Sequence, residues 1–214
     1  MALSVRQGEV TVTGSANCLH WAVADAPRES HQPSGDGFLV MRKDQKAILA
    51  VADGAGSGRL ARDATNRCLQ ALSECRTLDF HQVFDLCHRR LQGTRGAALA
   101  LVIVDVAQMM LEWAALGDID GLILSGPDER GPTVSMIQRP GTLGHTNPGV
   151  SPQRHPLGSG QLVCLTTDGV SRTYRDAPPL AAAPADLAPL LLETFGRDGD
   201  DRTVAVLMIG EGPP

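Results

Sequence analysis

Short apolar segments recur along most of the chain and are separated by polar or glycine-rich turns. Segments in which apolar and polar residues alternate predict half-buried strands, and short continuous apolar runs predict fully buried strands. On this basis we expect strands at 5–13, 18–24, 38–41, 47–52, 97–106, 109–116, 122–125, 133–137, 162–167 and 202–209.

Three other segments have the apolar spacing of an amphipathic helix. They are 58–75, 80–91 and 186–195, the last in spite of Pro189. Residues 140–160 are rich in Gly, Pro and Ser and predict a loop or a lid. Many strands with helices inserted between them indicate a layered α+β domain rather than a parallel sheet built from βαβ units.

Charge and hydropathy restrict the partners of this chain. Its 214 residues include 19 basic and 24 acidic ones, which gives a net charge of −5, and no basic block is present. Such a chain repels nucleic-acid backbones and offers no polybasic anchor for a membrane surface. The longest apolar run, 97–104, is too short to span a bilayer. We therefore expect neither nucleic acid nor a membrane as a partner.

The cysteines favour a reducing compartment. There are five of them, without paired CxxC spacing, and the N-terminus lacks the layout of a secretory signal. A cytoplasmic protein without a disulfide framework is therefore expected. One group of cysteines and histidines fits no compact zinc motif and is interpreted as buried cysteines and surface histidines. Its members are Cys68, Cys75, His81, Cys87 and His88.

Three acidic sites adjoin apolar strands. Asp53 and Asp168 each follow a predicted strand and precede a glycine, and Asp200 lies in an acidic group just before the last strand. A carboxylate at the end of an apolar strand loses hydration, so it stays ionised only if a cation or several donors compensate. Converging carboxylates of this kind predict a site for Mg²⁺ or Mn²⁺. Each glycine is expected to let the chain turn sharply and to expose its carbonyl.

Two simpler interpretations compete with a metal site. An Asp-Gly pair after a strand is usually only a turn. The glycines of 54–58 could also suggest a phosphate-binding loop, but they lack both the GxGxxG spacing and a following Gly-Lys-Ser/Thr. A nucleotide-binding α/β domain therefore stays as a weaker alternative.

In their order along the chain, these motifs resemble the PPM family of metal-dependent serine/threonine protein phosphatases, in particular its bacterial branch with SpoIIE and RsbX. The resemblance extends over residues 35–209. Six segments carry it: SGDGFLV (34–40), AVADGAGSG (50–58), TRGAALALV (94–102), ALGDIDGLIL (115–124), TTDGV (166–170) and DDRTVAVL (200–207).

The resemblance implies that Asp53, Asp168 and Asp200 are the catalytic carboxylates and hold two Mn²⁺ or Mg²⁺ ions. Asp118, with Asp168, would hold a third, weaker ion. The full set of implied metal-site residues is Asp53, Gly54, Asp168, Asp200, Asp118 and Asp36. Gly54 would contribute its carbonyl oxygen. Asp36 would either support the metal ligands from behind or contact a metal ion through a water molecule. Asp201 stands where many relatives carry Asn and is interpreted as a neighbour of the site.

The implied fold is a single PPM-type domain over 1–214, a four-layer αββα sandwich of two antiparallel sheets flanked by helices. The implied activity is hydrolysis of phosphoserine or phosphothreonine by metal-activated water. Its implied substrates are phosphorylated STAS-domain proteins of a stressosome, whose stress signal would thereby be reset.

Two departures from the family pattern concern catalysis. Ala55 occupies the position at which many eukaryotic members carry a histidine that protonates the leaving group. Arg28, the nearest candidate for a phosphate-binding arginine, is predicted to be a surface residue, so no substrate-binding residue is assigned. These departures predict modest turnover. They also leave an alternative, a catalytically weak pseudophosphatase that acts as a partner-binding module.

Overall fold

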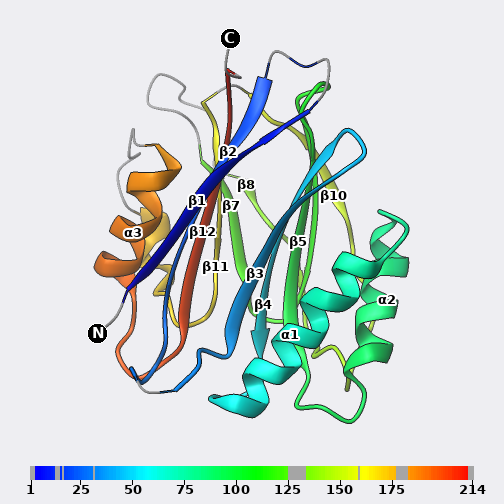
Figure 1. Cartoon of the computed structure of the whole chain (residues 1–214), viewed down its shortest axis with the longest axis vertical. Coiled ribbons are helices and arrows are strands. Elements are labelled where there is room, and N and C mark those ends of the chain that lie inside the picture. The colour runs from blue at the N-terminus through cyan, green and yellow to red at the C-terminus, as the bar shows by residue number, and fades with distance from the viewer. Residues whose placement is uncertain are drawn as a thin grey trace.

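The computed structural model of the chain describes residues 3–12, 15, 17–30, 32–124, 134–158, 160–176 and 183–211. In this part of the chain, two six-stranded sheets pack face to face (Figure 1). Helices cover the outer side of each sheet (Figure 1). The predicted strand ends at 13, 125 and 133 lie outside the described residues.

The first sheet has the order β1-β2-β12-β11-β7-β8. All its neighbouring strands are antiparallel. Its strands are β1 (Ser4–Thr11), β2 (Asn17–Ala26), β12 (Arg202–Glu211), β11 (Leu162–Thr166), β7 (Asp120–Leu124) and β8 (Val134–Ser135).

The second sheet has the order β10-β6-β5-β4-β3, and β9 pairs with β6 in parallel. Its strands are β3 (Asp36–Lys43), β4 (Lys46–Gly54), β5 (Ala97–Asp105), β6 (Met110–Leu116), β9 (Gln138–Arg139) and β10 (Gln153–Pro156). The helices α1 (Arg59–Glu74) and α2 (Phe80–Leu91) pack on this sheet, and α3 (Pro184–Phe195) packs on the first. The predicted αββα sandwich is confirmed.

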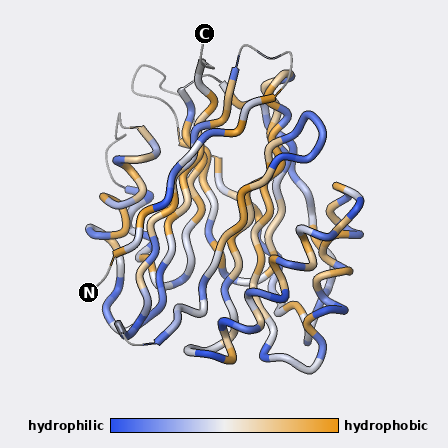
Figure 2. Tube along the Cα trace, in the orientation of Figure 1, coloured by the Kyte–Doolittle hydropathy of each residue, from blue (hydrophilic) through white to orange (hydrophobic). Residues whose placement is uncertain are grey.

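Strand β4 shows why the central strands are apolar on both faces. Ala47, Leu49 and Val51 belong to the core between the two sheets. The alternate residues Ile48 and Ala50 pack beneath α1 and α2. Successive side chains of a strand point to opposite faces, so a strand covered on both sides needs a continuous apolar run. For this reason the central strands are largely hydrophobic, which is the orange colour in Figure 2.

The described residues of 140–160 are mostly loop, as predicted, but they include one strand. They contain β10, which pairs with β6 at the edge of the second sheet. His155 of β10 packs edge-on against buried Trp113, with 5.7 Å between ring centroids. Farther back, Gly144 donates its backbone N–H to His88 Nδ1 (3.1 Å), and Asn147 donates to Asp85 (2.9 Å). These contacts with residues outside the segment hold it in place, although its composition alone favours a flexible loop.

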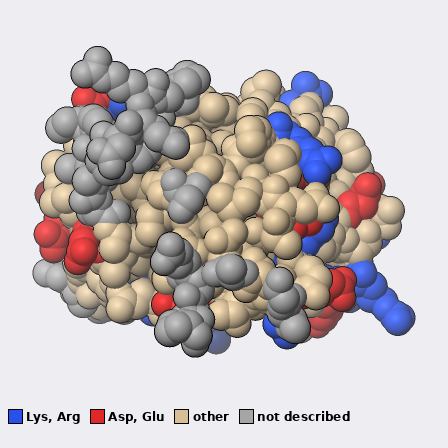
Figure 3. Space-filling model, turned by 90° about the horizontal axis from the view of Figure 1, so that it is seen from above, with Lys and Arg blue, Asp and Glu red and all other residues tan. Residues whose placement is uncertain are grey.

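Seen from above, positive and negative side chains are interspersed toward the periphery of the described surface, and uncharged residues fill its middle (Figure 3). Among the described helices, none is both long and apolar enough to cross a bilayer.

Candidate active site

The predicted acidic residues meet at one edge of the sandwich. Asp53 is the second-to-last residue of β4, and Asp118 follows β6 in the same sheet. Asp168 follows β11, and Asp200 precedes β12, which runs antiparallel to β11. The end of one strand and the start of an antiparallel neighbour lie at the same edge of a sheet. Each sheet thus contributes two carboxylates to this edge.

Three of these carboxylates form a tight group. Asp53, Asp118 and Asp168 each place one carboxylate oxygen so that all three oxygens lie within 4.8 Å of one another. Asp200 is not in that group, but it lines the same pocket, which has a volume of about 570 Å³. Gly54 is buried and does not line this pocket, so its carbonyl ligation stays a prediction.

Asp36 lies directly behind Asp53. The two residues face each other in the β3–β4 register, and alternation along both strands places their side chains toward the inter-sheet core. Asp36 is only 3% exposed, and its Oδ2 accepts a hydrogen bond from the Thr167 hydroxyl (2.7 Å). Its Oδ1 has no hydrogen-bond partner among the described residues. Asp36 therefore links the second sheet to the residue just before Asp168.

The group is electrostatically unfavourable without a cation. Burial raises the pKa of Asp53 to about 10, and the charges of Asp36, Asp168 and Asp118 add to the increase. Burial also raises the pKa of Asp36 to about 7, with a further contribution from Asp201. The pKa of Asp168 is raised by burial and then by Asp118 and Asp200. An oxygen-rich group that resists ionisation suits a hard divalent cation, whose charge stabilises the ionised form.

The two glycines after Asp53 and Asp168 allow close packing of the backbone at the strand ends. Neither has a positive φ angle. A Cβ on Gly54 would lie 2.1 Å from the Ala61 carbonyl oxygen, and one on Gly169 would lie 2.0 Å from the Asp201 carbonyl oxygen. The predicted sharp turn is present at Gly169, where Val170 donates its backbone N–H to the Thr167 carbonyl (3.0 Å), whereas Gly54 is still part of β4. Each glycine also permits another backbone segment to pack against the strand end.

Asp201 links the loop before β3 to the start of β12. Its Oδ1 accepts a hydrogen bond from the Arg28 backbone N–H and its Oδ2 one from Gly35 N–H, both at 2.7 Å. Asp201 is 5% exposed and is not among the residues that line the pocket. Its carboxylate is thus engaged in holding the loop that carries Arg28.

Arg28 is the pocket residue that sequence reasoning missed. It is exposed, as predicted, yet it lines the acidic pocket together with Asp53, Asp118 and Asp168. Among the described residues that line the pocket, only Arg28 is cationic. The Asp201 contact brings it there, and a bond between residues so far apart in the chain leaves no local sequence signal.

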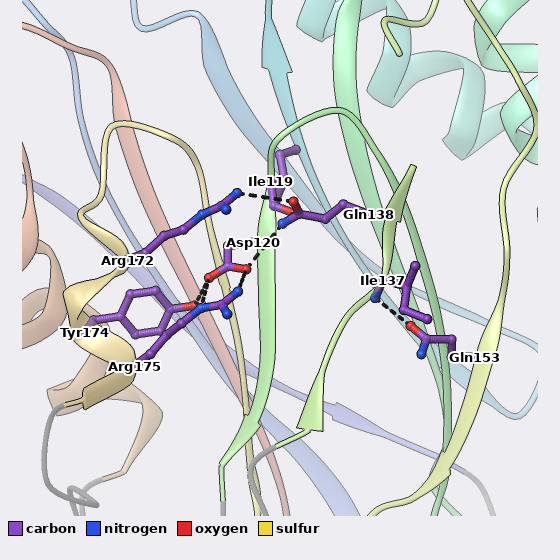
Figure 4. Close-up of polar contacts among 8 residues, drawn as sticks. All are labelled: Ile119, Asp120, Ile137, Gln138, Gln153, Arg172, Tyr174 and Arg175. Atoms are coloured by element: carbon purple, nitrogen blue, oxygen red, sulfur yellow. Dashed lines mark hydrogen bonds and ion pairs between the residues drawn. The ribbon is translucent and has the colours of Figure 1, made fainter. Parts of the chain in front are cut away.

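The second residue missed from the sequence is Asp120, whose carboxylate is surrounded by hydrogen-bond donors (Figure 4). It is 2% exposed, and Arg175 binds both its carboxylate oxygens. Tyr174 donates its hydroxyl to the same carboxylate (2.8 Å), and Gln138 donates at 3.3 Å. Asp120 therefore joins the strand that follows Asp118 to the short helix η1 (Arg172–Asp176), which follows Asp168.

No histidine is among the described residues that line the pocket. Ala55 lines it at the position where many eukaryotic family members carry the histidine that protonates the leaving group. The arrangement can hold hard cations through carboxylates and has one guanidinium group at the same pocket. Such a pocket fits a phosphoryl group, whose oxygens are bound by both metal ions and arginine.

Comparison with known proteins agrees with this geometry. Residues 43–207 match the family model of "Stage II sporulation protein E (SpoIIE)". The chain is 24% identical over 102 residues to "Phosphoserine phosphatase RsbX" of Bacillus subtilis (strain 168), which covers 48% of this chain and 51% of that protein. The matched region thus spans about half the length of this curated relative.

Solved structures share the fold. One, reported under the heading "The bacterial stressosome: a modular system that has been adapted to control secondary messenger signaling", has a TM-score of 0.79 and 31% identity, covering 88% of this chain and 98% of its own. RsbX in complex with magnesium has a TM-score of 0.78 and 18% identity, covering 97% of this chain and 100% of its own. The family match extends over most of the chain and includes the strands that carry Asp53, Asp118 and Asp168. The chain belongs to the SpoIIE family and has the sandwich fold of the PPM-type phosphatases.

Proposed function

We propose that the protein is a metal-dependent serine/threonine protein phosphatase of the PPM type. The observation that carries the proposal is the group of Asp53, Asp118 and Asp168, whose oxygens lie within 4.8 Å of one another at the wall of a pocket. The raised pKa values of Asp53 and Asp168 support it, because strongly shifted pKa values of neighbouring carboxylates are typical of functional sites.

Asp53, Asp168, Asp118 and Asp200 would hold Mg²⁺ or Mn²⁺ in this proposal, with Asp36 keeping Asp53 in place. Bound cations would supply electrostatic stabilisation of the phosphoryl charge and lower the pKa of a water molecule. Arg28 would orient the phosphate from the opposite wall, since guanidinium groups bind phosphate oxygens in a bidentate manner. Phosphoryl transfer needs mainly positioning and charge stabilisation, so a serine or cysteine nucleophile is not required.

The proposed substrates are phosphorylated serine or threonine residues on STAS-domain proteins of a stressosome. The curated relative is named a phosphoserine phosphatase, and a structural neighbour comes from work on the bacterial stressosome. We also propose that residues 1–214 act as one domain in the cytoplasm, where such signalling proteins would be reset.

A catalytically weak pseudophosphatase remains the second candidate. Ala55 favours it, because an alanine at the pocket wall cannot protonate a leaving group. The buried acidic group argues against it, since a pure binding module gains nothing from carboxylates that resist ionisation.

Hydrolysis of para-nitrophenyl phosphate with and without Mn²⁺ separates these candidates. We expect Mn²⁺-dependent turnover that Asp53→Asn removes and that Asp63→Asn, an exposed change on α1, leaves unchanged. Absence of turnover by the folded wild-type protein would favour the binding module. Dephosphorylation of purified phospho-STAS proteins, compared with an unrelated phosphopeptide, then tests the substrate class.

A further inference from the structure

A second cluster of metal-binding side chains lies on the β1–β2 hairpin. Glu9 of β1 faces His20 of β2 in the antiparallel register, and Cys18 stands two residues before His20. Residues two apart on a strand share a face, so the three side chains lie together. Their neighbours Val10 and Leu19 point into the inter-sheet core, which places the cluster on the outer side of the first sheet.

His20 already contacts both other side chains, one through each of its two ring nitrogens. Cys18 Sγ lies 3.1 Å from His20 Nε2, and His20 Nδ1 lies 3.2 Å from Glu9 Oε1. One donor atom from each residue can be chosen so that all three lie within 4.8 Å. Cys18 has no exposed surface, whereas His20 is partly exposed and Glu9 is exposed. A buried sulfur donor is thus combined with nitrogen and oxygen donors that solvent can reach.

We propose that Glu9, Cys18 and His20 form a binding site for a zinc ion. Thiolate, imidazole and carboxylate are the three ligand types that zinc prefers, whereas magnesium and calcium avoid sulfur. A thiolate and a carboxylate also balance the two positive charges of the ion. Zinc bonds of about 2.0–2.3 Å in a tetrahedron set ligand atoms roughly 3.3–3.8 Å apart, so the cluster would need to close by about 1.5 Å at most.

The surroundings provide an entry path and a fourth position. A pocket of about 320 Å³ is lined by Glu9, His20 and Met208, among others. Met208 pairs with His20 on β12, so a thioether or a water molecule can complete the coordination. The pocket also touches Pro184 at the start of α3.

The zinc cluster is remote from the acidic edge. Cys18 lies near the start of β2, whereas Ala26 at the other end of β2 pairs with Arg202, next to Asp201. The two sites would therefore be independent, with different donor chemistry, and the zinc site does not depend on the proposed phosphatase activity. Zinc there would fasten the β1–β2 hairpin to the sheet.

Cobalt titration of the metal-free protein in excess Mg²⁺ tests the proposal. Mg²⁺ saturates the all-oxygen site, and Co²⁺ bound to a thiolate gives a sulfur-to-cobalt charge-transfer band. We expect one equivalent of Co²⁺ to produce this band and one equivalent of Zn²⁺ to abolish it. Cys18→Ser should remove the band, and His20→Gln should weaken binding by about tenfold or more.

Controls separate the proposed site from other cysteines and from misfolding. Cys75→Ser and His81→Gln, both outside the cluster, should keep the band and the affinity. Since Cys18 is buried, Glu9→Gln and His20→Gln serve as variants at more accessible positions, and a melting curve in Mg²⁺ verifies their fold. Absence of the band in the wild-type protein, or an unchanged Co²⁺ affinity in folded His20→Gln, would overturn the zinc site.

Discussion

Asp53 and Asp120 lie at the same edge of the sandwich and are compensated in opposite ways. Asp120 is surrounded by donors: Arg175 binds both its oxygens, and Tyr174 and Gln138 add hydrogen bonds. Asp53 instead has other carboxylates beside it, and its pKa is raised to about 10. A buried charge that the protein itself neutralises is a structural device, whereas one left among like charges is prepared for an external cation.

The largest effect is expected from Asp53→Asn. If Asp53 holds the cations as proposed, its loss removes charge stabilisation worth several kcal/mol. We expect kcat/KM in saturating Mn²⁺ to fall by roughly 10³-fold or more, at about 1.4 kcal/mol for each factor of ten. The fold should persist in circular dichroism, and the exposed Asp63→Asn should retain full activity. Near-native turnover by folded Asp53→Asn would disprove its assignment.

Arg175→Met tests the other side of the comparison. It would leave Asp120, which is 2% exposed, without its cation. Removing one partner of a buried ion pair typically destabilises a protein by about 3 kcal/mol or more, and the 34% exposure of Arg175 places this pair at the lower end. Urea denaturation should reveal the loss, whereas Arg89→Met on the exposed side of α2 should change little. A loss below about 0.5 kcal/mol, as for an ordinary surface change, would show that Asp120 needs no cation.

Arg28→Met should produce a smaller effect than either of these two changes. If Arg28 contacts the phosphate, its loss removes a charge-assisted contact, and kcat/KM should drop by about tenfold. Mn²⁺ affinity, measured by calorimetry, should stay unchanged, as should the activity of the exposed Arg67→Met control on α1. A loss of Mn²⁺ affinity with normal substrate binding would instead assign Arg28 to the support of the carboxylates.

The pH dependence of stability gives the smallest effect. In the unfolded chain Asp53 titrates near about 3.9, but in the folded protein its pKa is about 10. Between these values the folded state binds more protons than the unfolded one, so the free energy of unfolding falls as the pH rises toward 10. In EDTA, denaturation between pH 6 and 9 should show a slope of about 1 kcal/mol per pH unit from this group. Asp53→Asn should flatten the slope; an equally steep slope in that variant would place the titration elsewhere.

The sequence predicted the strands well because the central ones are buried on both faces, and the family resemblance supplied their arrangement as a sandwich. Runs such as 47–52 and 162–167 stand out for that reason, and the spacing of α1 matches its buried face, from Ala61 to Leu72. The loop predicted at 140–160 is right for most of the described segment but misses β10, whose order comes from pairing with β6 and from the contact with Trp113. Composition reports local preference and cannot report a distant partner.

The acidic edge was accessible from the sequence only in part. Asp53, Asp168 and Asp200 were found because each adjoins an apolar run, and the family resemblance added Asp118 and Asp36. Arg28 and Asp120 were not assigned to the site. Their roles depend on Asp201 and Arg175, which lie 173 and 55 residues away from them in the chain. Such long-range contacts exist only once the sheets have come together.

Two carboxylates of the pocket project from one sheet and two from the other. Neither sheet alone therefore contains the complete ligand set, and the pocket exists only while the two layers remain in register. A ligand or partner that shifted one layer by even an ångström would separate donors now held within 4.8 Å. The rate of turnover would then depend strongly on how firmly the two sheets are held against each other.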